Sequence, residues 1–195
     1  MPKSQEKSYE DEDMEDLESQ ESEAGQNALD LLREDHRKVQ ELFEQFEQAD
    51  TRSKQRIVEE ALTELEIHAK LEEGLIYPAI REETNAEELM DMALEEHHVA
   101  TTLIKELKKM KPKDERFEAK FKVLAESVKH HIEEEENEIF PQAEETDLDF
   151  SELGMEAMER KEKLMGKSGK SSSRSKKKSP SAPGRAASSR KRKAA

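Results

Sequence analysis

The chain has 195 residues, of which 32% are hydrophobic and 42% charged, with a formal net charge of −15. This length accommodates one domain with tails or two very small ones. The absence of cysteine excludes disulfide frameworks and thiolate metal sites, and it fits a reducing compartment. No apolar run approaches the ~20 residues of a membrane helix, and the acidic N-terminus lacks the pattern of a secretory signal. We therefore expect a cytoplasmic protein with no membrane partner.

The N-terminal segment, residues 1–23, holds ten acidic and two basic side chains. It lacks the regular apolar spacing that a packed helix needs. Segments of low hydrophobicity and high net charge cannot bury enough apolar surface to offset the entropy lost on folding. We interpret this segment as a disordered acidic arm that precedes a folded domain over 24–146.

Between residues 24 and 146, apolar residues recur at spacings of three and four, as in helices that bury one face. We predict helices over 27–48, 52–77, 86–110 and 114–140, the last three with a proline near their ends. Their inward-facing residues are Leu29, Leu32, His36, Val39, Phe43 and Phe46; Val58, Ala61, Leu65, His68, Glu72 and Leu75; Met90, Ala93, His97, Ala100, Ile104 and Leu107; and Phe117, Phe121, Leu124, Val128, His131 and Glu135. Because short connections favour antiparallel neighbours, the expected fold class is all-α, an up-down-up-down four-helix bundle.

The C-terminal part of the chain divides into two segments. Residues 147–166 contain scattered apolar residues, and we predict a short, peripheral fifth helix from Asp149 or Ser151 to Leu164. Residues 167–195 hold eleven basic side chains and no acidic ones, so we expect a disordered basic tail. Such a tail can neutralise several phosphates and contact nucleic acid without base specificity. A solubilising extension or a partner for the acidic arm are the alternatives.

The two halves of the bundle repeat. Residues 68–78 and 131–141 lie 63 residues apart, and in each a His is followed by Glu at +4 and Pro at +10. The stretches around His36 and His97 also match, at a separation of 61 residues. The bundle is thus interpreted as two helix hairpins of one design, related by pseudo-two-fold symmetry, with a site on the axis.

Six polar residues lie on the faces that should be buried: His36, His68, Glu72, His97, His131 and Glu135. A single inward His is usually a hydrogen-bonded core residue. Two buried carboxylates that face each other are different, because they repel unless cations lie between them. On a helix, residues i and i+4 share a face, so each His-x-x-x-Glu pair can point at one spot. Inward-pointing Glu-and-His sets of this kind build dimetal sites in four-helix bundles.

This pattern of His, His-x-x-x-Glu, His and His-x-x-x-Glu on successive helices resembles the hemerythrin-like HHE cation-binding family over about residues 27–145. The resemblance implies a non-haem di-iron centre with bridging carboxylates, although manganese or zinc are alternatives. It also implies the ligand set. His36 and His68 would bind one iron, His97 and His131 the other, and the bridges would be Glu72 and Glu135.

The sequence departs from the oxygen-carrying hemerythrins, which place two His at i, i+4 on the third helix and bridge with an Asp on the fourth. The residues four positions from His97 are Ala93 and Thr101, and neither is a strong ligand. The fourth-helix carboxylate is Glu135, with Glu136 as a substitute. The expected site has two His per metal, two bridges and open positions, which favours redox reactivity or sensing over oxygen storage.

Three other residues lie near the proposed ligands. His98 and His130 point about 100° away from the adjacent ligand on a helix, so we expect them at the surface or in indirect contact with the site. We interpret Tyr77 as packing at a helix end, with a redox-active neighbour of the metals as the alternative.

We therefore expect a hemerythrin-like non-haem di-iron protein that binds or reacts with O2, NO or peroxide in sensing or stress defence. One alternative is a catalase-like, peroxidase-like or NO-reducing enzyme, so the sequence leaves open whether the protein catalyses a reaction. Another is an iron-binding bundle whose basic tail contacts nucleic acid. The sequence contains no nucleophile triad, phosphate-binding glycine loop or dinucleotide fingerprint.

Overall fold

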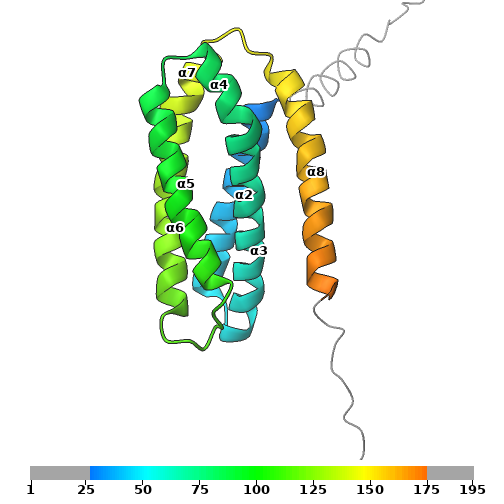
Figure 1. The fold of residues 1–195 in the computed structure, drawn as a ribbon. Coiled ribbons are helices and arrows are strands. Elements are labelled where there is room, and N and C mark those ends of the chain that lie inside the picture. Colours follow the sequence, from blue (N-terminus) through cyan, green and yellow to red (C-terminus); the bar gives the residue numbers. More distant parts are fainter. Residues whose placement is uncertain (1–26, 175–195) are drawn as a thin grey trace, which may run out of the picture.

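The computed structural model describes residues 27–174, with side chains through residue 166. The predicted acidic arm and residues 175–195 of the predicted basic tail lie outside the described residues. Four long helices form an antiparallel bundle: α2 (Ala28–Gln48), α3 (Thr51–Leu71), α5 (Glu87–Leu107) and α6 (Phe117–Glu134) (Figure 1). The described part of the chain contains no strand, so the predicted all-α bundle is confirmed. No helix in this part is both long and apolar enough to cross a membrane.

The first two helices begin where side chains cap them. The Asn27 side chain accepts a hydrogen bond from the Leu29 amide at 2.8 Å, and the Asp50 side chain accepts one from the Ser53 amide at 2.7 Å. Each oxygen satisfies an amide that has no partner in the first helical turn. The observed starts of α2 and α3 therefore lie within one residue of the predicted ones.

The second and fourth helices continue through their prolines, which corrects the predicted ends at residues 77 and 140. A π-helical turn, η1 (Glu72–Ile76), joins α3 to α4 (Tyr77–Glu83), and a second one, η2 (Glu135–Ile139), joins α6 to α7 (Phe140–Glu144). Pro78 and Pro141 occupy the first turn of α4 and α7. A proline lacks the N–H and its ring crowds the carbonyl four residues earlier. The π-turn before each proline, with its hydrogen bond across five residues, changes this local geometry and lets the helix continue.

Each π-turn begins at a Glu of the predicted site. The Tyr77 amide donates to the carbonyl of Glu72 and the Phe140 amide to that of Glu135, five residues earlier in both cases. A π-turn bulges the helix, and such turns are frequent at functional sites. The 63-residue repeat of the sequence is thus also a repeat of this irregular local structure.

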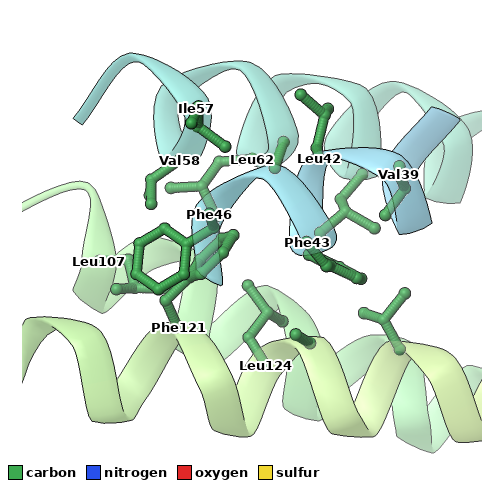
Figure 2. Packing of buried hydrophobic residues seen from close by; sticks show 14 of the residues in the cluster. Val39, Leu42, Phe43, Phe46, Ile57, Val58, Leu62, Leu107, Phe121 and Leu124 are labelled. Atoms are coloured by element: carbon green, nitrogen blue, oxygen red, sulfur yellow. The ribbon is translucent and has the colours of Figure 1, made fainter. Parts of the chain in front are cut away.

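The buried apolar residues form two clusters along the bundle axis. The larger lies toward the α2–α3 and α5–α6 turns, where Phe46 and Phe121 pack with ring centroids 4.4 Å apart and Phe43 lies 5.6 Å from Phe121 (Figure 2). The smaller cluster surrounds the π-turns and includes Ile76, Ile139 and the N-terminal turns of α2. The polar residues of the site lie between the two clusters, so apolar packing holds the helices together on both sides of them.

A fifth helix, α8 (Phe150–Arg174), lies beside α2 and α3 (Figure 1). Gly154 and Ala157 are buried on its inner face, and their small size allows the helices to approach closely. The peripheral helix was expected to end at Leu164, so its predicted end is ten residues too early, and residues 167–174 of the predicted disordered tail are helical. Gly166 does not end the helix, because a single glycine costs only about 1 kcal/mol relative to alanine.

Candidate metal centre

All six residues singled out in the sequence meet inside the bundle. His36 comes from α2, His68 from α3 and Glu72 from η1, and the second half contributes His97, His131 and Glu135 from α5, α6 and η2. The four histidines are at most 6% exposed, and both glutamates are fully buried. Such a concentration of ionisable groups in a low-dielectric interior requires compensating interactions.

The histidines form two pairs in which the Nε2 atoms face each other. These atoms are 3.1 Å apart in His36 and His68 and 3.0 Å apart in His97 and His131. Two nitrogen ligands about 2.1 Å from one metal ion, at an angle of about 90–110°, are separated by about 3.0–3.4 Å. The spacing of both pairs fits two donors to a common ion.

The two glutamates lie between the histidine pairs. Glu72 places Oε1 3.0 Å from His68 Nε2 and Oε2 3.3 Å from His97 Nε2. Glu135 Oε2 lies 3.2 Å from His36 Nε2 and 3.4 Å from His131 Nε2. Each carboxylate therefore reaches a histidine of both halves, which is the arrangement that a bridging ligand requires.

Three of these four carboxylate oxygens lack a hydrogen bond in the structure: both oxygens of Glu72 and Oε2 of Glu135. The nearby imidazole nitrogens are close enough but poorly directed for hydrogen bonding. An ionised carboxylate that is buried without partners is strongly destabilising. Cations held between the histidine pairs would satisfy these oxygens. The site thus fits a metal centre on its geometry and on its unsatisfied atoms.

The donors form two overlapping groups, one of His36, His68, Glu72 and Glu135 and one of Glu72, His97 and His131, with ligand atoms within 4.8 Å of one another. Glu72 belongs to both. Mixed imidazole and carboxylate donors suit first-row metals such as iron, manganese and zinc.

Four outer carboxylates, Asp35, Glu73, Glu96 and Glu136, surround the histidines. Glu136 lies 2.8 Å from His36 Nδ1, Glu73 lies 3.0 Å from His97 Nδ1, and Glu96 lies 2.8 Å from His131 Nδ1. Asp35 is 3.7 Å from His68 Nδ1, too far for a hydrogen bond. A carboxylate at Nδ1 orients the imidazole so that Nε2 points inward, and it makes that nitrogen a better metal donor.

The outer carboxylates were not predicted from the sequence as a set. Glu136 was interpreted as a substitute bridge, but its carboxylate holds a histidine instead. A signal was present, because each outer carboxylate directly adjoins a ligand candidate in the sequence and recurs in both halves. A neighbour on a helix is rotated by about 100°, which aims these side chains across the bundle at a histidine of another helix.

The buried charges shift one another's pKa. Burial alone would lower the pKa of His68, but the carboxylates of Glu72 and Asp35 outweigh it and raise this pKa to about 10. The pKa of His97 is also raised, against burial, by the nearby Glu72 carboxylate, which lies 3.3 Å from His97 Nε2. The Glu72 pKa lies well below its usual value, because the two histidines outweigh the effect of burial. Without metal, this part of the site therefore pairs the His68 imidazolium with the Glu72 carboxylate.

Tyr77 was expected to pack at a helix end, but its side chain also contacts two residues of the site. Its hydroxyl donates a hydrogen bond of 2.5 Å to Glu135 Oε1, and its ring stacks on His97 at 5.6 Å. Burial and the charges of Glu72 and Glu135 raise the Tyr77 pKa well above 10, so the hydroxyl keeps its proton. The repeat places Phe140 at the equivalent position, where it stacks on His36 at 5.9 Å. The hydroxyl is thus present in one half only.

Helix α8 contacts the site from outside the bundle. Lys161 forms an ion pair with Asp35, whose carboxylate lies 3.7 Å from His68 Nδ1. Arg160 donates a 2.8 Å hydrogen bond to the carbonyl of Gly74 within η1. A β-carbon at Gly74 would lie 2.9 Å from this guanidinium, so the glycine makes room for the arginine.

The remaining candidates lie away from the ligand atoms. His98 is exposed, and the 64% exposed side chain of His130 lies 3.4 Å from Glu134, as expected for surface residues. A cavity of about 300 Å³ adjoins the histidines on the side of the larger apolar cluster, and Thr101 lines it. The histidines therefore face an accessible space, whereas Glu72 and Glu135 are closed off behind them.

Comparisons with known proteins agree with this geometry. A hemerythrin HHE cation-binding domain-containing protein from Mycobacterium kansasii is similar in structure, with a TM-score of 0.66 and 26% identity over 78% of this chain and 94% of that one. A DNA nickase from Nostoc sp. is 30% identical over 118 residues, which are 58% of this chain but 32% of the nickase. The chain thus spans about a third of that relative. The family model of the hemerythrin HHE cation-binding domain matches residues 27–143, more than half of the chain. The chain therefore belongs to the hemerythrin HHE cation-binding domain family.

Proposed function

We propose that the bundle holds two non-haem irons and binds or reacts with a small ligand, O2, NO or peroxide, in sensing or stress defence. The observation that carries this proposal is the pair of facing Nε2 atoms in each half, linked by carboxylates whose oxygens lack other partners. His36 and His68 would hold one ion, His97 and His131 the other, and Glu72 and Glu135 would bridge them. The cytoplasmic location expected from the sequence remains a prediction.

The side chains have distinct roles in this proposal. Bound iron would supply redox and Lewis-acid chemistry. The outer carboxylates orient the imidazoles, and the Tyr77 hydroxyl holds a proton at Glu135 Oε1, next to the proposed bridge. The apolar residues of the adjoining cavity lower the local dielectric constant, which strengthens electrostatic interactions in the site.

Metal analysis of the protein isolated from its native host tests the identity of the metal. Two irons per chain, with an optical spectrum that changes on reduction and on exposure to air, are expected. Stoichiometric manganese or zinc in place of iron would overturn the di-iron proposal while leaving the metal centre itself intact.

Peroxide turnover separates a binding protein from an enzyme. The iron-loaded protein is mixed with hydrogen peroxide and the release of oxygen is followed, with the metal-free protein as control. Many turnovers per iron favour a catalase-like enzyme. A spectral change at one equivalent without turnover favours binding or sensing.

A second candidate function is contact with nucleic acid through the basic tail. The similarity to a DNA nickase and the eight basic side chains of residues 175–195 favour it. Deletion of residues 175–195 should abolish binding to duplex DNA of arbitrary sequence, and the affinity of the full chain should fall steeply with salt. Equal binding by the deleted and full chains would rule this function out.

A further inference from the structure

The cavity beside the histidines is larger than a diatomic molecule or hydrogen peroxide requires. Its volume is about 300 Å³, and a water molecule in the liquid takes about 30 Å³, so roughly ten non-hydrogen atoms of a ligand fit. Its walls are mainly apolar and include Leu65, Ile104 and Val128. Small-molecule sites in proteins are of this kind, mostly apolar with a few polar groups that orient the ligand.

The cavity opens on one side of the bundle because the repeat is broken there. Between α3 and α5, its lining includes Ala69 and Ala100, which are both partly exposed. The sequence repeat places Ile132 and Val39 at the equivalent positions between α6 and α2, where they are 3% and 2% exposed. Large side chains close one seam of the bundle, and alanines leave the other seam open.

The charge at the mouth of the cavity is also reversed relative to the repeat. Lys70 and Lys105 are exposed at the open seam, and the equivalent residues at the closed seam are Glu133 and Glu44. Eight other lysines form ion pairs within residues 27–166, but Lys70 and Lys105 form none there.

The acidic side chains at the same mouth already have partners. Asp35 pairs with Lys161 and Glu66 with Lys108, and the carboxylates of Glu73 and Glu96 face Nδ1 of His97 and His131. In a chain with a net charge of −15, the mouth therefore presents two ammonium groups without a carboxylate partner of their own. This charge favours an anionic group at the surface end of the cavity.

We propose that the cavity binds an unbranched medium-chain carboxylic acid of about eight carbons. Its carboxylate lies between Lys70 and Lys105, and its chain extends past Ala69 and Ala100 toward the histidines. Octanoate has ten non-hydrogen atoms, which matches the volume of the cavity. This inference goes beyond the proposed function, because it concerns a second ligand whose chain would occupy the path to the metals.

The test is calorimetric titration of the iron-loaded full chain with octanoate. Saturable binding of one octanoate per chain is expected, with acetate and octanol binding at least tenfold more weakly because each lacks half of the recognised molecule. Ala69→Ile with Ala100→Val copies the closed seam and should abolish binding. Lys70→Glu with Lys105→Glu copies its charge and should weaken octanoate about tenfold or more while leaving octanol unchanged.

Lys129→Glu, a charge reversal near the closed seam, is the matched control and should leave octanoate binding unchanged. Circular dichroism and iron content establish that each variant is folded and loaded, and if the cavity-filling variant fails to fold, the lysine variant decides. Absence of octanoate binding at millimolar concentration, or equal binding by the lysine variant and its control, would overturn the proposal. Because the titration does not involve peroxide, O2 or NO, its outcome is independent of the function proposed above.

Discussion

The first hairpin of the bundle, 28–83, and the second, 87–144, carry the same set of metal-ligand candidates on the same irregular helices. Both place a histidine opposite a His-x-x-x-Glu pair, and both begin a π-turn at the glutamate. They differ at Tyr77 against Phe140, at Ala69 against Ile132, and in the contact of α8, which reaches Asp35 in the first half only. The shared features are the metal-ligand candidates. The differences concern a hydroxyl proton, the access to the site and the support from α8. Two metal ions in this site would need equivalent ligands, whereas a small ligand would approach from one side only.

The largest expected effect comes from removing a feature that the halves share. Glu72→Gln and Glu135→Gln should each lose most of the bound metal, because a neutral amide bridges two cations poorly. Without metal, the Glu72→Gln variant should be less stable than the parent, because the buried His68 imidazolium loses its carboxylate partner. Metal analysis and thermal unfolding of metal-free protein measure the two effects. Full metal content in both variants would falsify the metal-ligand assignment.

Tyr77→Phe makes the two halves alike at the position of the hydroxyl. It leaves Glu135 Oε1 without its donor, and an unsatisfied buried acceptor costs about 1–3 kcal/mol. The free energy of unfolding of the metal-free protein should fall by about this amount, as measured by urea denaturation. Phe140→Tyr is the matched control, since it adds a hydroxyl to the other half. If Tyr77→Phe is as stable as the parent, the hydrogen bond contributes nothing to the fold.

Metal binding should release protons near pH 7. In the metal-free protein the pKa of His68 is about 10, above its unfolded value, so the imidazole is protonated and must lose its proton to bind metal. Calorimetry in buffers of different ionisation enthalpy measures this release, and about one proton or more per chain is expected.

The same shift has a consequence for stability without metal. Because the folded-state pKa of His68 is raised, its contribution to stability is fully present below pH ~6.5 and is lost as the pH rises toward 10. The unfolding free energy of the metal-free protein should therefore decline across this window. His68→Gln, which cannot titrate, should decline less, and a parallel decline in both proteins would contradict the assignment.

The smallest effect is expected for the contact that only the first half has with α8. Lys161→Met removes the ion pair with Asp35 and should weaken metal binding in the first half about threefold, less than the 10–100-fold typical of a direct outer partner. Glu96→Gln, which removes the partner of His131 in the second half, provides the larger reference effect. Competition with a chelator measures both affinities. Equal losses in the two variants would mean that α8 supports the site as strongly as the bundle does.

The sequence by itself determined the bundle and the set of residues in its centre. Helical spacing of apolar residues requires one buried face per helix, and any His or Glu on that face must then enter the interior. The fold class could be predicted for this reason, as could the convergence of His36, His68, Glu72, His97, His131 and Glu135. The cap residues Asn27 and Asp50 likewise fixed two helix starts, because capping is a local interaction.

The residues that support this set, and the open side of the bundle next to it, depend on how the helices pack against one another. The outer carboxylates bind histidines of other helices, so their partners depend on the rotation and offset of whole helices. Tyr77 meets Glu135 across 58 residues of sequence, and Lys161 meets Asp35 across 126. The helix ends at Pro78 and Pro141 were mispredicted because the π-turns that accommodate these prolines are stabilised by packing around the buried glutamates. Sequence spacing specifies which side chains point inward, but contacts between helices are set when the core packs.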